Sequence, residues 1–361
     1  MNRFGVNQPR FHQPSANQLS TGKSSTKHVV GVDIGGANLK YATAFSDPEI
    51  RPVAHACCFP MWRRPEDLAQ ALIGDLHSLG PCDAMAVTMT GELADGFVDR
   101  AVGVTHIVEH TMRAAGEIGI DDVRFYRVDG SFCDAHKAIN EPDAVAAANW
   151  HALASWIAGR IESDALLVDI GSTTTDLIPI ADGSVNTDAA TDFHRLREGT
   201  LVYVGCRRTA VCSLVDSLVH RGDRVSVMNE VFATIDDARI VLKANVESQD
   251  DVDTADGMPR TIAMSVNRLA RMIGLDHRSV SIDDAVNLAQ QVVLAARTRV
   301  QASFERLWDG RSVVVLSGHA ADLIDLPDGI RTVSLCEQFG PDVSRSAPAY
   351  AVAELCLSEL S

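Results

Sequence analysis

Two segments of the chain place a carboxylate, glycines and small polar side chains together, as phosphate-binding turns do. The first follows a short β-branched run and contains Asp33, Gly35 and Gly36, with Asn38 and Lys40 after them. The glycines permit positive φ and carry no side chain, so backbone N–H groups can approach an anion closely. We expect Gly35, Gly36, Asn38 and Lys40 to bind phosphate, and Asp33 to be catalytic and to hold a hydrated Mg²⁺.

The second segment repeats this arrangement between Asp169 and Asp176, with the sequence Asp-Ile-Gly-Ser-Thr-Thr-Thr-Asp. Its hydroxyl groups can donate hydrogen bonds to phosphate oxygens without crowding them, and either carboxylate could share the metal ion. We expect Asp169 and Asp176 to be catalytic, with Asp169 as the second metal ligand. Two tight hairpin turns with polar caps are the alternative, but their matching positions favour an anion site. The predicted phosphate contacts of this segment are Gly171, Ser172, Thr173 and Thr174.

Three further groups of residues have types that suit the same chemistry. Arg207 and Arg208 follow a glycine-containing strand and could clamp phosphate oxygens, although a solvent-facing helix N-terminus would also explain them. Glu92 follows a strand end and is a candidate general base or, alternatively, a turn cap. The acidic stretch with Asp253 and Asp256 is either a solvated loop or a contact for an amine or a metal, and its spacing does not fit an EF-hand.

Other catalytic patterns are weak or missing in this sequence. His106, Glu109 and His110 match the zinc-peptidase pattern H-x-x-E-H, but an amphipathic helix with two histidines one turn apart is the favoured interpretation. The sequence has neither the G-x-S-x-G nor the G-x-x-x-x-G-K-[ST] pattern. These absences exclude a serine hydrolase of the nucleophile-elbow type and a P-loop enzyme.

The predicted elements that position these residues alternate between strands and helices. The first half is expected to contain a hairpin across Gly35 and Gly36, a helix with Leu68, Leu72 and Leu76 on one face, a buried strand at 84–89 and an alanine-rich helix at 143–159. The second half restarts with strands at 165–169 and 176–180. It continues with helices near 208–220, 259–273 and 281–306, a strand at 312–317 and a closing helix at 347–360.

Two similar strand–turn–strand units imply two α/β halves that face one another. We predict a tail at 1–27, an N-terminal domain at 28–160 and a C-terminal domain at 161–361. The second domain is expected to carry an inserted helical and loop region near 185–280, and its last helix to pack back on the first domain.

Composition narrows the possible partners. The chain has 361 residues and a formal net charge of −16, and all 48 acidic residues follow residue 27. Such a body argues against nucleic acid and against an anionic membrane surface as partners. No apolar run approaches the roughly 20 residues of a membrane span. The first 27 residues lack the apolar core of a secretory signal, and the eight cysteines include no C-x-x-C pair, so we expect a cytoplasmic protein without disulfides and with a disordered tail.

The paired turns resemble the two phosphate motifs of the sugar kinase/Hsp70/actin superfamily. The resemblance implies two ribonuclease-H-like domains with phosphate and Mg²⁺ in the cleft between them. The superfamily's adenosine loop would fall at Val313-Val-Val-Leu-Ser-Gly318-His319-Ala320. Gly318 is counted with the phosphate contacts, whereas His319 replaces the usual second glycine and argues against tight adenosine binding. ATP is therefore a possible but disfavoured ligand.

A narrower resemblance covers nearly all of the chain after the tail. The segment 169–176 is similar to the hydantoinase/oxoprolinase branch of that superfamily. Four further segments together resemble the tetrahydromethanopterin-linked C1-transfer pathway proteins. They are Thr90-Gly-Glu-Leu93, Ala147-Ala-Asn-Trp150, Gly199-Thr-Leu-Val-Tyr-x-Gly-x-Arg-Arg-Thr209 and Asp253-Thr-Ala-Asp-Gly-x-Pro-Arg260. Ala210 stands where the family has proline.

The archaeal relatives of that family are methanofuran-biosynthesis synthases. The resemblance implies a transferase of one-carbon metabolism, in which the phenol of γ-glutamyltyramine attacks an aminomethylfuran diphosphate and diphosphate leaves. The implied partners are a small diphosphate substrate and an amine or phenol acceptor. Two alternatives stay open: an ATP-dependent kinase or hydantoinase/oxoprolinase-like hydrolase, and a non-enzymatic nucleotide-dependent regulator. The sequence does not indicate the oligomeric state.

Overall fold

The N-terminal half forms a six-stranded sheet, in which the first strand has an antiparallel hairpin partner on one side and a parallel strand on the other. The structure, a computed structural model, describes residues 26–310, 313–319 and 321–360, so the tail predicted at 1–27 lies almost wholly outside the described residues. The strand order is β3-β2-β1-β4-β5-β6, with β2 antiparallel and β4 parallel to β1. The strands are β1 (His28–Ile34), β2 (Asn38–Phe45), β3 (Ala54–Cys58), β4 (Ala84–Met89), β5 (Val123–Tyr126) and β6 (Phe132–Cys133).

The C-terminal half repeats this topology in a second sheet. Its order is β10-β8-β7-β13-β14, with β8 antiparallel to β7 and β13 parallel to it, and β9 added beside β8. Five strands in this order make each half ribonuclease-H-like, which confirms the predicted fold class. The strands are β7 (Ala165–Ile170), β8 (Thr175–Ala181), β9 (Ser184–Val185), β10 (Leu201–Val202), β13 (Val313–Gly318) and β14 (Arg331–Ser334).

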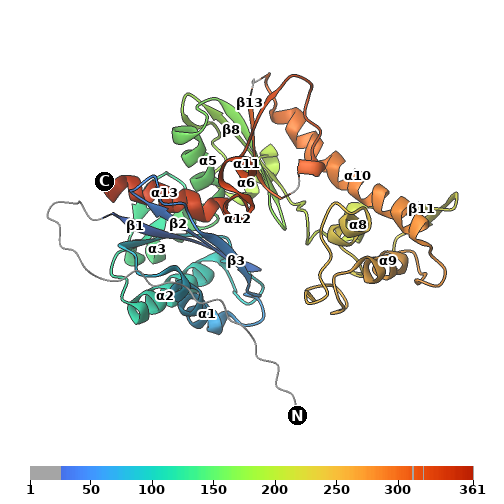
Figure 1. Cartoon of the computed structure of the whole chain (residues 1–361), viewed down its shortest axis with the longest axis horizontal. Helices are drawn as coiled ribbons and strands as arrows, with labels where there is room; N and C mark the ends of the chain where they lie inside the picture. The colour runs from blue at the N-terminus through green and yellow to red at the C-terminus, as the bar shows by residue number, and fades with distance from the viewer. Residues whose placement is uncertain (1–25, 311–312, 320, 361) are drawn as a thin grey trace, which may run out of the picture.

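Helices cover both sheets and separate them (Figure 1). On the outer face of the first sheet lie α1 (Leu68–Leu76) and α2 (Arg100–Ile118), the latter capped by Asp99 at its start and by Gly119 at its end. Between the sheets lie α5 (Asn149–Arg160) and α13 (Ala347–Leu360), whose alanines share one core with residues of both sheets. The contact is so close that a Cβ on Gly31 would lie 1.9 Å from the carbonyl oxygen of Ala349.

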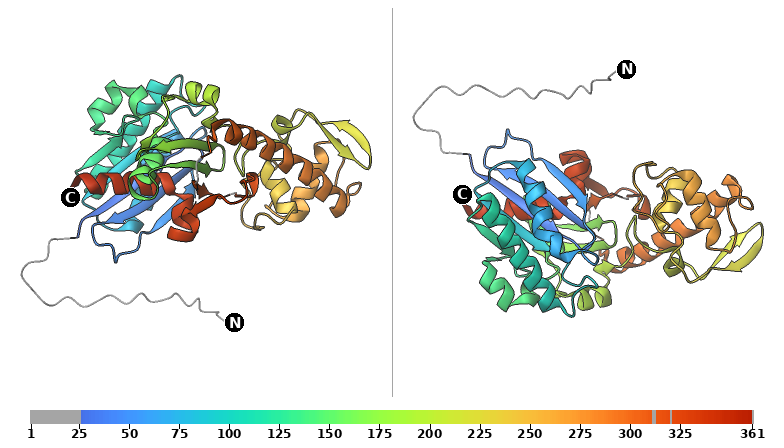
Figure 2. Two further views of the ribbon diagram at one scale, coloured as in Figure 1. Left: turned by 90° about the horizontal axis from the view of Figure 1, so that it is seen from above. Right: turned by 90° about the horizontal axis from the view of Figure 1, so that it is seen from below.

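The far face of the second sheet carries a helical unit that projects to one side of the two sheets (Figure 2). The longest helix, α10, begins at a Ser281–Asp284 capping box. The elements of this region are α7 (Val211–Leu214), β11 (Ser217–His220), β12 (Asp223–Ser226), α8 (Ile235–Val241), α9 (Ile262–Arg271) and α10 (Ile282–Leu307). The remaining helices of the described residues are α3 (Ala135–Asn140), α4 (Pro142–Val145), α6 (Asp192–Glu198), α11 (Leu335–Phe339) and α12 (Pro341–Arg345), besides short 3₁₀ segments at 65–67, 77–79 and 321–323.

Two predicted helices differ from the observed elements. The helix expected at 208–220 is wrong beyond the single turn of α7, because Arg221 and Gly222 both have positive φ and close a two-residue hairpin between β11 and β12. The helix expected at 143–159 is interrupted at Ala147, whose φ is 47°. Among the described residues, none of the helices has the length and apolar character needed to cross a membrane.

Candidate functional site

The two predicted phosphate turns have the same geometry. In the first, the N–H of Gly35 donates to the carbonyl of Asn38 at 3.0 Å; in the second, the N–H of Gly171 donates to the carbonyl of Thr174 at 2.9 Å. Each turn therefore joins the central strand of its sheet to the neighbouring antiparallel strand in the same way. The duplication predicted from the sequence is present in the backbone itself.

A cleft of about 700 Å³ lies between the two turns. Residues of the first turn region, Asn38 and Lys40, line it together with Asp169, Gly171 and Ser172 of the second. Five arginines, one lysine and three aspartates in its lining make the interior strongly polar. The predicted cleft residues Arg207, Arg208 and Gly318 also line it, whereas Asp33, Gly35, Gly36, Glu92, Thr173, Thr174 and Asp176 lie outside its lining.

Asp33 and Asp169 occupy equivalent positions at the ends of β1 and β7. Asp33 is buried, its Oδ2 lies 3.7 Å from Nζ of Lys40, and its Oδ1 has no hydrogen-bond partner among the described residues. Burial raises the pKa of Asp33 against the opposing charge of Lys40. Burial also raises the pKa of Asp169 to about 6, and the carboxylates of Asp176 and Asp33 add to this effect. Carboxylate oxygens are the hard ligands that Mg²⁺ prefers, and at least one of them, Oδ1 of Asp33, is not used in a hydrogen bond within the described residues.

Asp176 stands opposite Asp169 across the β7–β8 pair, yet it is already engaged. The buried guanidinium of Arg195 forms an ion pair with its Oδ1 and also donates to the carbonyl of Thr200 at 3.2 Å. The Cζ atom of Arg195 lies 4.3 Å from the ring centre of Trp150. Sequence analysis missed Arg195, because an arginine on a short helix with charged neighbours is typical of a solvated surface.

Glu92 lies behind the first turn. The N–H groups of Thr90 and Gly91 both donate to the carbonyl of Ile34, which fixes this segment to the end of β1. The Glu92 side chain is buried, with Oε1 3.9 Å from Nε of Arg100 and Oε2 without a hydrogen-bond partner among the described residues. Burial raises the pKa of Glu92 to about 7. A carboxylate with this pKa can accept and release a proton near neutral pH.

Arg207 and Arg208 share a backbone contact, but their side chains contact different residues. Their N–H groups both donate to the carbonyl of Ser172, in the second turn. Arg207 then pairs with Asp251 at 2.8 Å and with Asp253 at 3.5 Å, whereas Arg208 lies over the ring of Trp62 at 4.8 Å. Asp253 therefore borders the cleft, while the other acidic candidate, Asp256, holds α9 through Arg268 and Arg271.

Gly318 ends β13 against the second turn. Its φ is +84°, and a Cβ there would lie 2.2 Å from the carbonyl oxygen of Ile170. The N–H of His319 donates to that same oxygen at 3.1 Å. The imidazole of His319 lines the cleft, and burial lowers its pKa to about 4, so the ring is neutral at physiological pH.

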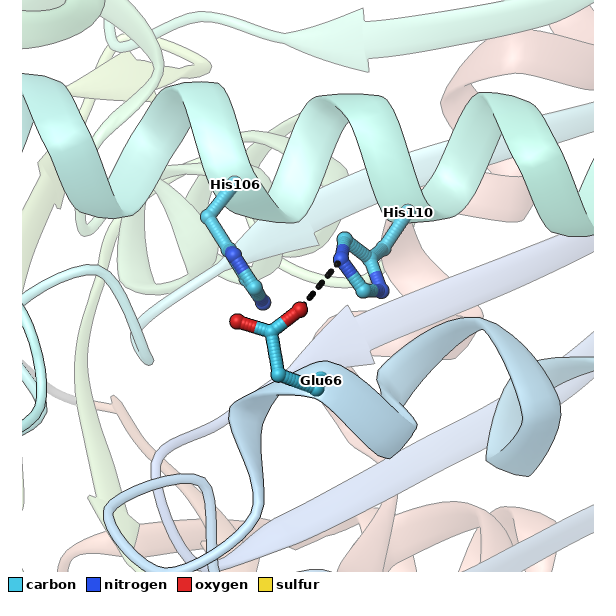
Figure 3. A group of neighbouring side chains, drawn as sticks. All are labelled: Glu66, His106 and His110. Atoms are coloured by element: carbon cyan, nitrogen blue, oxygen red, sulfur yellow. Dashed lines mark ion pairs between the residues drawn. The ribbon is translucent and has the colours of Figure 1, made fainter.

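The two histidines of α2 meet Glu66, not Glu109 (Figure 3). One ligand atom from each of the three residues lies within 4.8 Å of the others, as a metal site would require. However, Nδ1 of His110 accepts a hydrogen bond from the N–H of Ala69 at 3.3 Å, so in the neutral ring Nε2 carries the proton. His106 contacts the carbonyl of Pro65 at 3.0 Å. These contacts join α2 to the start of α1, and they leave His110 without a lone pair directed at Glu66.

Comparisons with known proteins extend over most of the chain. Residues 83–355 match the family described as hydantoinase/oxoprolinase. A protein of Methanocaldococcus jannaschii is 31% identical over 335 residues, which cover 92% of this chain and 98% of the relative. A protein of Methanococcus vannielii is 28% identical over 217 residues, which cover 58% of this chain and 97% of the relative. Both relatives are named (4-{4-[2-(gamma-L-glutamylamino)ethyl]phenoxymethyl}furan-2-yl)methanamine synthase.

Among solved structures, a nucleotide-free acetone carboxylase has a similar fold. The TM-score is 0.53 at 10% sequence identity, and the match covers 91% of this chain and 70% of that chain. The similarity concerns the fold alone.

Proposed function

The chain belongs to the hydantoinase/oxoprolinase family, and from this premise we propose that it is a synthase that joins an aminomethylfuran diphosphate to a γ-glutamyltyramine-type phenol. The observation that carries the proposal is the 31% identity to the Methanocaldococcus jannaschii synthase over 98% of that relative's length. The polar cleft between two anion-binding turns supports it, because the reaction must hold and release a diphosphate.

The reaction needs charge stabilisation more than a covalent nucleophile. The C–O bond between the furan methylene and the diphosphate breaks, and its electron pair leaves with the diphosphate. The phenol oxygen then forms the new C–O bond to that methylene, and the phenolic proton passes to a base. Stabilising the departing negative charge is the main task of such a site.

The backbone amides and hydroxyls of the two turns would bind the diphosphate. We assign this role to Gly35, Gly36, Asn38 and Lys40 of the first turn, and to Gly171, Ser172, Thr173 and Thr174 of the second. Arg207 and Gly318 complete the set, because both lie against the second turn. Arg207 keeps its orientation through Asp251, so its guanidinium loses little freedom on binding.

Asp33 and Asp169 fit a magnesium ion. Both are carboxylates near strand ends: Asp33 is buried, Asp169 is half-buried in the cleft lining, and Oδ1 of Asp33 has no hydrogen-bond partner among the described residues. When bound there, Mg²⁺ would offset the negative charge that develops on the diphosphate. Lys40 forms an ion pair with Asp33. Arg195 forms an ion pair with Asp176, so we assign Arg195 a positioning role.

We assign the phenolic proton to Glu92. Its pKa of about 7 matches a base that works near neutral pH, and it follows directly on the segment that is fixed to the first turn. The carboxylate is buried, so this role requires the bound acceptor to uncover it.

The test is to incubate the purified protein with aminomethylfuran diphosphate, γ-glutamyltyramine and Mg²⁺, without ATP. We expect stoichiometric amounts of condensed product and diphosphate, detected by mass spectrometry and a coupled diphosphate assay. A folded protein that forms neither contradicts the proposal. Product that forms only with ATP would favour a kinase-type mechanism instead.

A further inference from the structure

Arg208, which lines the cleft, and Trp62 connect the two phosphate turns. Trp62 follows Met61, whose N–H donates to the carbonyl of Gly36 at 2.9 Å, so its backbone is fixed to the first turn. The N–H of Arg208 donates to the carbonyl of Ser172 at 2.9 Å, which fixes it to the second turn. The Cζ atom of Arg208 lies 4.8 Å from the centre of the Trp62 ring.

Arg208 differs from its neighbours in its partners. Arg207, Arg239 and Arg260, which also line the cleft, each pair with an aspartate. Arg208 forms no ion pair with any residue that the structure describes, and its contact is the π face of Trp62. A diphosphate carries full negative charges, so it competes well with an aromatic face for this guanidinium.

We propose that Trp62 is the platform for the furan ring of the diphosphate substrate, and that Arg208, which now covers the ring, moves to the diphosphate when the substrate binds. This inference rests on the proposed function. The furan ring is one methylene away from the diphosphate, and Trp62 is one residue away from a residue bound to the first turn. A half-buried indole at this distance presents the flat apolar surface that an aromatic ring packs on.

The same face suits the chemistry of the donor. As the C–O bond breaks and the electron pair leaves with the diphosphate, positive charge develops on the methylene and the furan ring before the phenol oxygen bonds. The Trp62 ring contacts a cation, the Arg208 guanidinium. The ring therefore exchanges one cation for another that exists only during the reaction.

The test compares Trp62→Leu with Trp62→Phe. We expect Trp62→Leu to raise the KM for aminomethylfuran diphosphate about three- to tenfold, which is the value of one aromatic pair. We expect an unchanged KM for γ-glutamyltyramine. The Kd for inorganic diphosphate should stay unchanged or fall, because this ligand has no ring and the variant removes the aromatic contact that competes for Arg208. Trp62→Phe should stay within about twofold of the wild type. Equal weakening of inorganic diphosphate, or a change in the acceptor KM instead, overturns the proposal.

A fluorescence measurement tests the movement of Arg208 without a destabilised variant. Inorganic diphosphate with Mg²⁺ should change the tryptophan emission of Trp308→Phe, which removes a ring stacked on Phe304 at the end of α10. It should leave the emission of Trp62→Phe unchanged. An equal response in both variants overturns the release of Arg208. A wild-type protein that forms no product would instead contradict the proposed function, and the fluorescence response would still be measurable.

Discussion

The guanidinium of Arg195 pairs with the carboxylate of Asp176 directly behind the second phosphate turn, and both groups are buried. Asp176 faces Asp169 across the β7–β8 pair, so three carboxylates, including that of Asp33, share a small volume with two cations. Arg195 neutralises Asp176, which does not line the cleft. The charge left for a metal and a diphosphate is therefore set by a residue that lines no part of the cleft.

Replacing Arg195 by Met should destabilise the protein by about 3–5 kcal/mol, because Asp176 then remains buried without a partner. The double variant Arg195→Met, Asp176→Asn should recover most of that loss. Urea denaturation followed by circular dichroism measures both. If the single and double variants lose the same stability, the ion pair does not compensate Asp176 and its role is packing against Trp150.

Glu92 should make stability depend on pH. Its pKa is about 7 in the folded protein and about 4.5 when unfolded, so the folded state binds more protons in that interval and loses stability as the pH rises through it. Glu92→Gln should therefore be more stable than the wild type by about 3 kcal/mol above pH 8 and equal to it below pH 4. Melting temperatures across this range give the difference.

The same residue predicts the pH dependence of activity. A base with a pKa of about 7 must be deprotonated to work, so kcat/KM for the acceptor should fall about tenfold per pH unit below 7. Glu92→Gln should lose this dependence together with most of the turnover. A pH profile that is flat between 5.5 and 8 in the wild type would contradict the assigned role.

Local patterns were sufficient to predict the paired turns, their strands and the ribonuclease-H-like fold. In both turns a glycine follows two residues after an aspartate near the end of a strand, and this local pattern favours a tight hairpin, so the hydrogen bonds at Gly35 and Gly171 follow from neighbouring residues. The prediction of a helix at 208–220 was wrong because a local backbone signal was overlooked. Its apolar residues fit a helix, whereas the positive φ of Arg221 and Gly222 commits the segment to a hairpin.

The residues that the sequence analysis missed owe their roles to contacts between segments that are distant in the sequence. Arg195 and Trp62 gain their importance only where Asp176 and Arg208 lie beside them, and nothing in the residues around either one signals this. Glu66 replaces Glu109 beside His106 and His110 because α1 and α2 pack together. The domain boundary between residues 160 and 161 and the catalytic roles of the individual residues stay predictions.

Asp33→Asn should separate an enzyme from a regulator. The variant keeps the shape of the side chain but removes the charge that Lys40 and a magnesium ion need, so turnover should fall by about 10² to 10³ while the fold is kept. Asp47→Asn, in the turn that follows β2, is the matched control and should behave as the wild type, because asparagine can still accept the hydrogen bond from the N–H of Glu49. Calorimetry should show weaker Mg²⁺ binding for Asp33→Asn alone. Full turnover in this variant would remove Asp33 from the site.

Gly318→Ala tests whether the close contact between β13 and the second turn shapes the diphosphate site. Gly318 and Gly329 have nearly the same φ, +84° and +81°, but a Cβ on Gly318 meets the carbonyl oxygen of Ile170 at 2.2 Å, whereas one on Gly329 meets nothing within 4 Å. Gly329→Ala should therefore lose only about 1 kcal/mol for its backbone conformation, and Gly318→Ala about 2–4 kcal/mol. Because Ile170 lies between Asp169 and Gly171, the clash should also weaken diphosphate binding in Gly318→Ala alone. Calorimetric titration with inorganic diphosphate and Mg²⁺ measures this, and equal affinity in both variants would show that the contact supports stability without positioning the turn.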